Sequence, residues 1–110
     1  MKLSFTIYQT AAREYYFKLK TAAGELLLTG NRYASVQACR NDIVCVRLNA
    51  GRAGAYERRM TLNTCFEFVI RNLEGDMIAR SQAFVSSHTR DKMVEIVKSL
   101  AREAAVNDLT

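Results

Sequence analysis

The sequence contains no proline, no tryptophan, a single histidine and three cysteines. Because proline is absent, no predicted strand or helix is interrupted and no proline-rich linker divides the chain. An odd number of cysteines without a C-x-x-C pair cannot complete a disulfide framework and lacks the spacing of a zinc ribbon. Cys39 and Cys45 fall on different faces of a predicted helix, so we expect reduced, structural thiols.

Long apolar runs are also missing. No stretch of about 18 apolar residues occurs, and the segment after Met1 and Lys2 alternates at once between apolar and polar residues. We therefore expect no signal peptide, no membrane partner and a location in the bacterial cytosol. The length of 110 residues, with 49% hydrophobic and 25% charged residues, is typical of one soluble globular domain covering residues 1–110.

Positive charge is concentrated in the first half of the chain. Residues 1–55 carry eight Lys or Arg against three Asp or Glu, a net charge of +5, whereas residues 56–110 carry eight of each. This asymmetry indicates either an anion-binding side on the first half or an accident of surface composition.

The sequence repeats itself with a shift of 51 positions, which lays residues 5–50 on residues 56–101 without a gap. The identical pairs are Thr10/Thr61, Phe17/Phe68, Gly24/Gly75, Ser35/Ser86, Val46/Val97 and Ala50/Ala101. Such self-similarity predicts two copies of one supersecondary unit, at about 1–54 and 55–110. A unit of about 50 residues is marginal alone, so we expect the two copies to share one core.

Each copy predicts three strands followed by a helix. Period-two alternation or apolar runs bounded by turns predict strands at 5–8, 15–20, 26–29, 56–61, 65–71 and 76–82. Apolar residues at steps of three and four predict a helix after Ser35 and another after Ser86 or Ser87, and the tail at 106–109 could add a strand. The predicted fold is α+β, an antiparallel sheet with both helices on one face and pseudo-twofold symmetry.

The motifs F-T-I-Y-Q, Y-Y-F-K-L-K-T-A-A-G-E and F-E-F-V-I-R-N-L-E-G-D-M-I, in this order and spacing, resemble the YegP-like family of small bacterial proteins over nearly the whole chain. The resemblance implies an internal pseudo-dimer with exchanged terminal strands, an uncharacterised function and no catalytic residues to carry over. The chain departs from the family pattern at Asp42 and Met93, where a small residue is usual, and at Gly30, where the second copy has Ser81.

Catalytic, metal and cofactor motifs are not recognisable in the sequence. His88 lies near Ser86 and Asp91, but these residues share one predicted helical turn, which does not allow the geometry of a Ser-His-Asp triad. One histidine without a paired acidic motif gives no transition-metal site, and the glycines at 51 and 54 lack the flanking residues of a phosphate-binding loop. We expect a non-enzymatic protein that needs no cofactor.

Two groups of basic residues are candidate binding sites. Arg47, Arg52 and Arg58 surround the predicted connection between the copies and could bind an anion. Strand parity places a second group on the sheet face opposite the helices, namely Tyr8, Tyr16, Lys18, Lys20, Arg59, Val69 and Arg71, with Thr6, Glu57 and Glu67 on the same face.

The sequence leaves two functions open. A small binding module that contacts a protein partner or self-associates through its sheet is the first. The alternative is binding of single-stranded nucleic acid or another anionic ligand at the open sheet face, where aromatic rings and cations can contact bases and phosphates.

Overall fold

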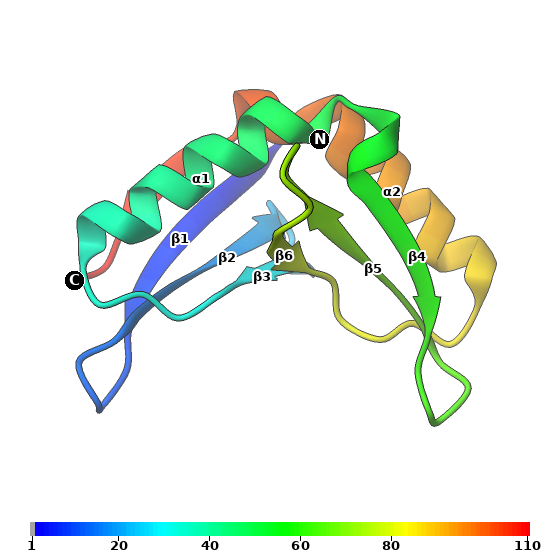
Figure 1. Cartoon of the computed structure of the whole chain (residues 1–110), viewed down its shortest axis with the longest axis horizontal. Helices are drawn as coiled ribbons and strands as arrows, with labels where there is room; N and C mark the ends of the chain where they lie inside the picture. Colours follow the sequence, from blue (N-terminus) through cyan, green and yellow to red (C-terminus); the bar gives the residue numbers. More distant parts are fainter. Residues whose placement is uncertain (1) are drawn as a thin grey trace.

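The computed structural model describes residues 2–110, which form a mixed sheet covered by two α-helices (Figure 1). The first half contains β1 (Leu3–Gln9), β2 (Tyr15–Thr21), β3 (Leu26–Gly30) and α1 (Val36–Ala50). The second half contains β4 (Tyr56–Met60), β5 (Phe66–Arg71), β6 (Met77–Arg80) and α2 (Ser87–Leu100). Short 3-10 turns η1 (Ala53–Ala55) and η2 (Ala101–Glu103) precede β4 and the last strand, β7 (Ala105–Asp108). All predicted strands and helices are confirmed.

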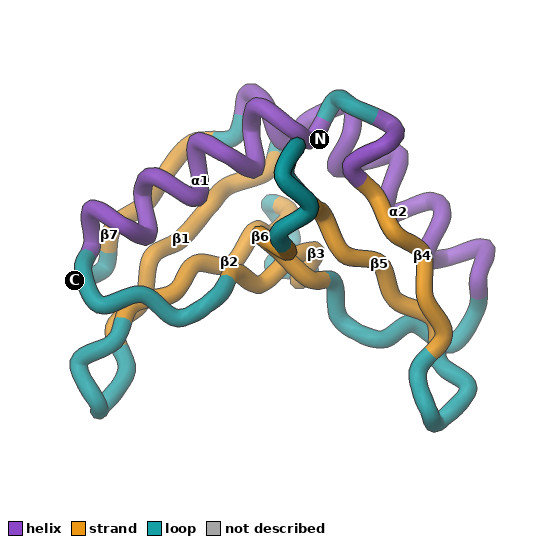
Figure 2. The backbone as a smooth tube through the Cα atoms, viewed as in Figure 1, coloured by secondary structure: helices purple, strands orange, loops and turns teal. Residues whose placement is uncertain are grey.

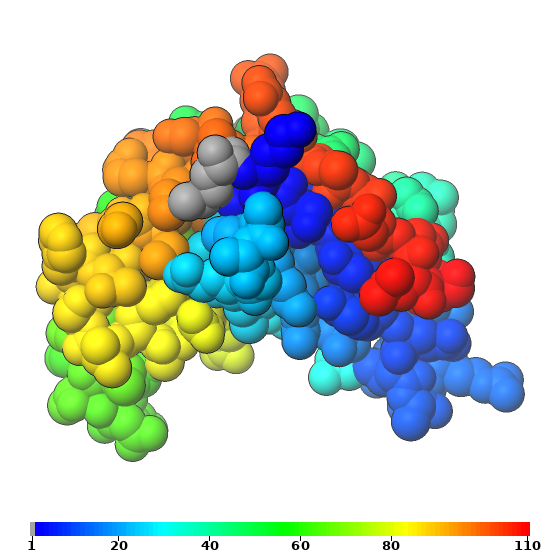
Figure 3. Space-filling model, turned by 180° about the vertical axis from the view of Figure 1, so that it is seen from behind, coloured from blue at the N-terminus to red at the C-terminus, as the bar shows by residue number. Residues whose placement is uncertain are grey.

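The strand order in the sheet is β4-β5-β6-β3-β2-β1-β7 (Figure 2). All neighbours are antiparallel except β1 and β7, which run parallel with Phe5 opposite Val106. In the space-filling view the C-terminal segment (red) lies along the N-terminal segment (blue) (Figure 3). The prediction of a wholly antiparallel sheet is therefore wrong at this edge. The strand β7 follows α2 and η2 and so reaches the side of β1 without a hairpin. No tight turn therefore imposes antiparallel pairing on β7.

The centre of the sheet relates the two halves. Thr29 of β3 pairs with Arg80 of β6, and these two residues correspond under the 51-residue shift. Backbone irregularities recur at the same interval: the left-handed glycines Gly24 and Gly75, the bridges Tyr15–Tyr33 and Phe66–Phe84, and the bulges at Leu19/Lys20 and Ile70/Arg71. The same local backbone features thus occur in both halves at the spacing of the sequence repeat.

Serine side chains begin both helices. The hydroxyl of Ser35 accepts a hydrogen bond from the Ala38 N–H at 3.1 Å, and that of Ser86 accepts one from the Thr89 N–H at 3.1 Å. Each bond satisfies a backbone donor that the first helical turn leaves without a partner. The cap of the second helix is therefore Ser86 rather than Ser87.

The core lies between the helices and one face of the sheet. Phe5 and Phe17 on the first-half strands and Phe68 on β5 have no exposed surface. Their rings belong to one buried cluster with the apolar stripes of both helices, to which Ile43 and Val94 contribute. Because strand side chains alternate between faces, the other face carries the intervening residues and stays open to solvent. Among residues 2–110, no helix is long and apolar enough to cross a membrane.

Val69 corrects the prediction for the open face. It has the predicted parity, yet its side chain is fully buried. Its cross-strand neighbours on this face are Glu57 and Arg80. Because its side chain has no exposed surface, the position is unavailable to a ligand.

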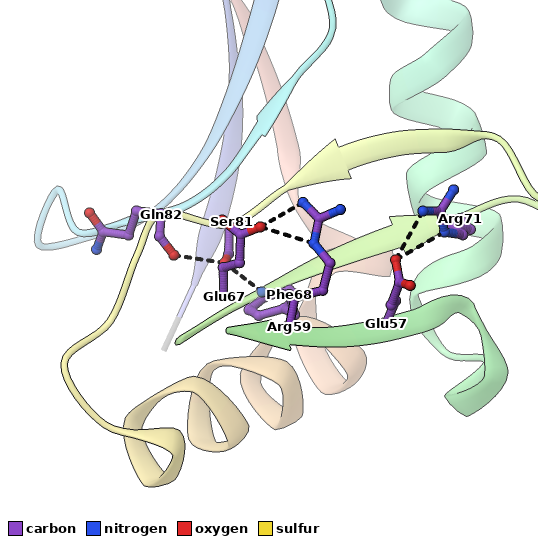
Figure 4. A network of polar contacts seen from close by, with 7 residues as sticks. All are labelled: Glu57, Arg59, Glu67, Phe68, Arg71, Ser81 and Gln82. Carbon is purple, nitrogen blue, oxygen red and sulfur yellow. Dashed lines mark hydrogen bonds and ion pairs between the residues drawn. The ribbon is translucent and has the colours of Figure 1, made fainter. Parts of the chain in front are cut away.

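The departure at Gly30 reflects different core packing in the two halves. A β-carbon on Gly30 would lie 2.1 Å from Cε2 of Phe17, so the phenyl ring fills the space that a serine side chain would need. In the second half the Ser81 hydroxyl accepts a hydrogen bond from the Phe68 N–H at 2.9 Å and donates one to the Gln82 carbonyl at 2.8 Å (Figure 4).

Asp42, which differs from the small residue usual in the family, is hydrogen-bonded to a tyrosine. The Tyr33 hydroxyl donates a hydrogen bond to the Asp42 carboxylate. The corresponding residues of the second half, Phe84 and Met93, are both apolar and are 6% and 8% exposed. A hydrogen-bonded polar pair in one half thus corresponds to two buried apolar residues in the other.

Candidate binding face

Two tyrosines on the open face of the first half stack against each other. Tyr8 on β1 and Tyr16 on β2 are direct cross-strand partners. Their ring centroids lie 5.2 Å apart with an interplanar angle of 21°. Aromatic pairs of this kind stabilise a strand pair and hold both rings in fixed positions.

Three cations lie over these rings. The Lys18 Nζ lies 5.4 Å from the Tyr8 ring centroid and 5.9 Å from that of Tyr16, and the Lys20 Nζ lies 5.8 Å from the Tyr8 centroid. The Arg32 guanidinium carbon lies 4.8 Å from the Tyr16 centroid. These five residues, hereafter the cationic face, form one contiguous surface on which ring faces orient positive charge.

Arg32 was not predicted as part of this surface. It lies in the exposed loop after β3, where strand parity says nothing about direction. The one feature of the sequence that could have indicated its place on this face is that it follows the end of β3 by two residues.

The cationic face is not neutralised. Within residues 2–110, neither Lys18 nor Lys20 nor Arg32 forms an ion pair with an acidic side chain. The open-face neighbours in this half include Thr6 and Thr29, which carry no charge. Unpaired cations in one patch raise the local positive potential and attract polyanions.

On the open face of the second half, two arginines are paired with acids of the same face (Figure 4). Arg59 donates to Glu67 at 3.0 Å and 2.5 Å, and Arg71 donates to Glu57 at 2.9 Å. The structure therefore places Arg59 and Arg71 on the predicted face but pairs both with carboxylates. Each guanidinium would have to exchange an internal partner for a ligand, which lowers the gain from binding.

The three arginines near the connection are bound to separate parts of the protein. Arg47 donates to the Ala104 carbonyl, and its guanidinium carbon lies 5.7 Å from the Phe5 ring centroid. Arg52 donates to the side chain of Asn49 at 2.9 Å.

Arg58 pairs with Asp91 at 3.0 Å. The structure thus does not bring the three arginines together around one open anion site.

Known proteins with similar sequences identify the family. The chain is 33% identical over 106 residues to a UPF0339 protein of Acinetobacter baylyi, with 96% of each chain covered. The chain belongs to the UPF0339 family. The family includes the YegP protein of Escherichia coli, 26% identical over 96% of both chains, which confirms the resemblance found in the sequence. A family model described as a domain of unknown function, DUF1508, matches residues 11–57.

Solved UPF0339 structures share this fold. The solution NMR structure of YegP from Escherichia coli matches with a TM-score of 0.92 and 26% identity, covering 100% of this chain and 95% of the other. That of a UPF0339 protein from Shewanella oneidensis matches with a TM-score of 0.93 and 24% identity, covering 100% and 93%. Both similarities confirm the α+β architecture. The function of the family is unknown.

The remaining reactive side chains of this UPF0339 chain are separate from the cationic face. His88 is exposed, and hydrogen bonds from Arg90 and Arg58 lower the pKa of Asp91. Burial raises the pKa of the Cys39 thiol from 9.0 to about 11 and also raises that of Cys45, which keeps both thiols protonated at neutral pH. The described residues contain no group of three His, Cys, Asp or Glu side chains that could hold a metal ion.

Proposed function

We propose that this chain is a non-enzymatic binding module whose cationic face binds single-stranded nucleic acid. The observation that supports this function is the set of three unpaired cations, Lys18, Lys20 and Arg32, held over two stacked tyrosines. On the corresponding surface of the second half, Arg59 and Arg71 are each paired with a carboxylate.

Preorganisation favours phosphate binding at this face. A free lysine or arginine side chain loses rotamer freedom when it contacts a ligand, which costs about 0.5–1.5 kcal/mol per side chain. The tyrosine rings already restrict Lys18 and Arg32, so less freedom is lost on binding. Phosphates contacted by these cations release counterions, which provides a salt-dependent driving force.

Bases have a stacking surface beside the phosphates. One face of the Tyr16 ring lies against Tyr8, and the guanidinium of the exposed Arg32 lies next to the Tyr16 ring. Guanidinium planes and aromatic rings both stack on nucleobases, with little sequence preference. A flexible single strand can place its bases here, whereas a duplex keeps its bases stacked inside.

Fluorescence anisotropy of labelled single-stranded RNA and DNA across a salt series tests this proposal. We expect log K to fall linearly with log salt concentration, and Lys18→Gln/Lys20→Gln to lower the slope by about 1.4 for two lost phosphate contacts. Lys92→Gln/Lys98→Gln on α2 removes the same charge from another element and is the matched control.

Two outcomes would overturn the proposal. The first is no binding even at low salt. The second is an equal loss of affinity in the α2 control, which would make binding a consequence of net charge alone. Competition by inorganic polyphosphate as strong as that by unlabelled RNA would restrict the ligand to its phosphate chemistry and remove the role of bases.

A further inference from the structure

One edge of the sheet is covered by the chain itself, and the corresponding edge is not. The outer side of β1 pairs with β7, where the Ile7 carbonyl accepts a hydrogen bond from the Leu109 N–H at 3.1 Å. Under the 51-residue shift Ile7 corresponds to Arg58 in β4. Among the described residues β4 pairs only with β5, so its outer side is an open edge (Figure 2).

The alternation of a β-strand determines which backbone groups of β4 point away from β5. The Thr61 N–H, just after β4, donates to the Cys65 carbonyl at 2.7 Å and so points toward β5. Alternate residues point the other way, which directs the N–H and C=O groups of Arg58 and Met60 outward. The Tyr56 carbonyl also points outward, while its N–H is bound to the carbonyl at the start of η1.

We propose that this edge binds the β4 edge of a second copy of the chain, antiparallel, with a twofold axis at Arg58. Arg58 then exchanges N–H···O=C bonds with its twin, and each Met60 N–H donates to the Tyr56 carbonyl of the second copy. Antiparallel pairing about an outward-pointing residue satisfies the groups on both strands at once. The two sheets become one continuous sheet.

The side chains of β4 are self-complementary in this arrangement. Glu57 lies opposite Arg59 of the second copy, and Tyr56 lies opposite Met60 of the second copy. Apolar pairs directly across two strands stabilise their pairing. Glu57 and Arg59 keep their internal partners, and their opposite signs avoid the repulsion that like charges would cause across the two strands. Charges on an edge strand usually prevent association, but here their order makes the strand complementary to itself.

The exposure and the charges of the β4 side chains are compatible with pairing to a second copy of the chain. Met60 is 64% exposed although it is apolar, and pairing would cover it. The two Arg58 side chains would face each other, which is unfavourable for like charges, but each is held by its own Asp91 at 3.0 Å. A twofold pairing therefore requires no new partner for the arginines.

Light scattering after size-exclusion chromatography, run from micromolar to millimolar protein, tests the proposal. We expect a concentration-dependent dimer that Arg58→Pro abolishes, because proline lacks the outward N–H and is tolerated on an edge strand. Met60→Lys should weaken dimerisation on the order of tenfold, since two Tyr–Met contacts are lost per dimer. Leu73→Lys, at an 83% exposed position away from the edge, is the matched control and should dimerise normally.

Amide hydrogen exchange locates the interface and covers the case in which Arg58→Pro fails to fold. The amides of Arg58 and Met60 should become protected as the protein concentration rises. A monomer at every concentration would overturn the proposal. So would a dimer that Met60→Lys leaves unchanged, or one whose formation protects other strands. The measurements contain no nucleic acid, so they are independent of the function proposed above.

Discussion

The open faces of the two halves share a backbone but differ in chemistry. The stacked tyrosines of the first half, Tyr8 and Tyr16, correspond to the ion pair of Arg59 and Glu67 in the second. The register that stacks two rings in one half thus joins two opposite charges in the other. The comparison shows that strand pairing determines which side chains meet, while residue type decides whether the surface is left charged or neutralised.

The largest expected effect comes from exchanging the core residue that differs between the halves. Gly30→Ser would place a side chain in the space of the Phe17 ring, 2.1 Å from its nearest atom. We expect a loss of about 3 kcal/mol in the free energy of unfolding, as for overpacked cores. Urea denaturation measures the loss, and a stability equal to that of the unmodified chain would contradict the packing described here.

A second exchange converts the surface of the first half into that of the second. Tyr8→Arg/Tyr16→Glu should form an ion pair like that of Arg59 and Glu67 and remove the rings under the three cations. We expect the fold to persist and affinity for single-stranded RNA to fall by roughly 30-fold, about 2 kcal/mol of stacking and charge positioning. Circular dichroism and anisotropy report the two results. Unchanged affinity would show that the tyrosines are not needed.

A third exchange concerns the contact that is polar in one half and apolar in the other. Tyr33→Phe leaves the Asp42 carboxylate without its hydrogen-bond donor and should cost about 1 kcal/mol. Adding Asp42→Met reproduces the Phe84 and Met93 pair, and we expect it to restore most of the loss. A double-mutant cycle by urea denaturation measures the coupling, and additive effects would contradict a direct contact.

The smallest expected effect on stability at neutral pH comes from two tyrosines, Tyr33 and Tyr56, whose counterparts in the other half are the phenylalanines Phe84 and Phe5. Burial, together with the hydrogen bond to Asp42, raises the pKa of Tyr33, and burial raises that of Tyr56. The folded chain therefore holds these phenol protons more tightly than the unfolded chain does. Stability is full below the ordinary pKa of 10.0 and is lost as the pH rises above it.

Urea midpoints measured at neutral pH and above pH 10 check this dependence. In Tyr56→Phe the alkaline decrease should be smaller than in the unmodified chain. Equal decreases in the two proteins would show that Tyr56 ionises as easily in the folded chain as in the unfolded one.

Much of the fold could be predicted because the periodicity is strong and occurs twice. The alternation in β2 and the stripe of α1 determine which faces are buried, and a serine marks the start of each helix. The parallel pairing of β7 could not be predicted, since it depends on where η2 delivers the chain. The burial of Val69 could not be predicted either, since parity gives the face on which a side chain lies but not how much of it is covered.

The candidate face was only partly predictable. Parity placed Tyr8, Tyr16, Lys18 and Lys20 together, but it placed Arg59 and Arg71 there on equal terms. The difference arises from register, because only the pairing of β4 with β5 shows that a carboxylate lies within reach of each arginine. Arg32 could not be found in this way because it lies in a loop.

Chemical-shift mapping tests the difference between the two faces most directly. A 15N-labelled sample titrated with a short single-stranded RNA at low salt should show shifts in β1, β2 and the Arg32 loop, with β4 and β5 unchanged. Shifts centred on β4 and β5, or no shifts on either face, would contradict the assignment of binding to the cationic face.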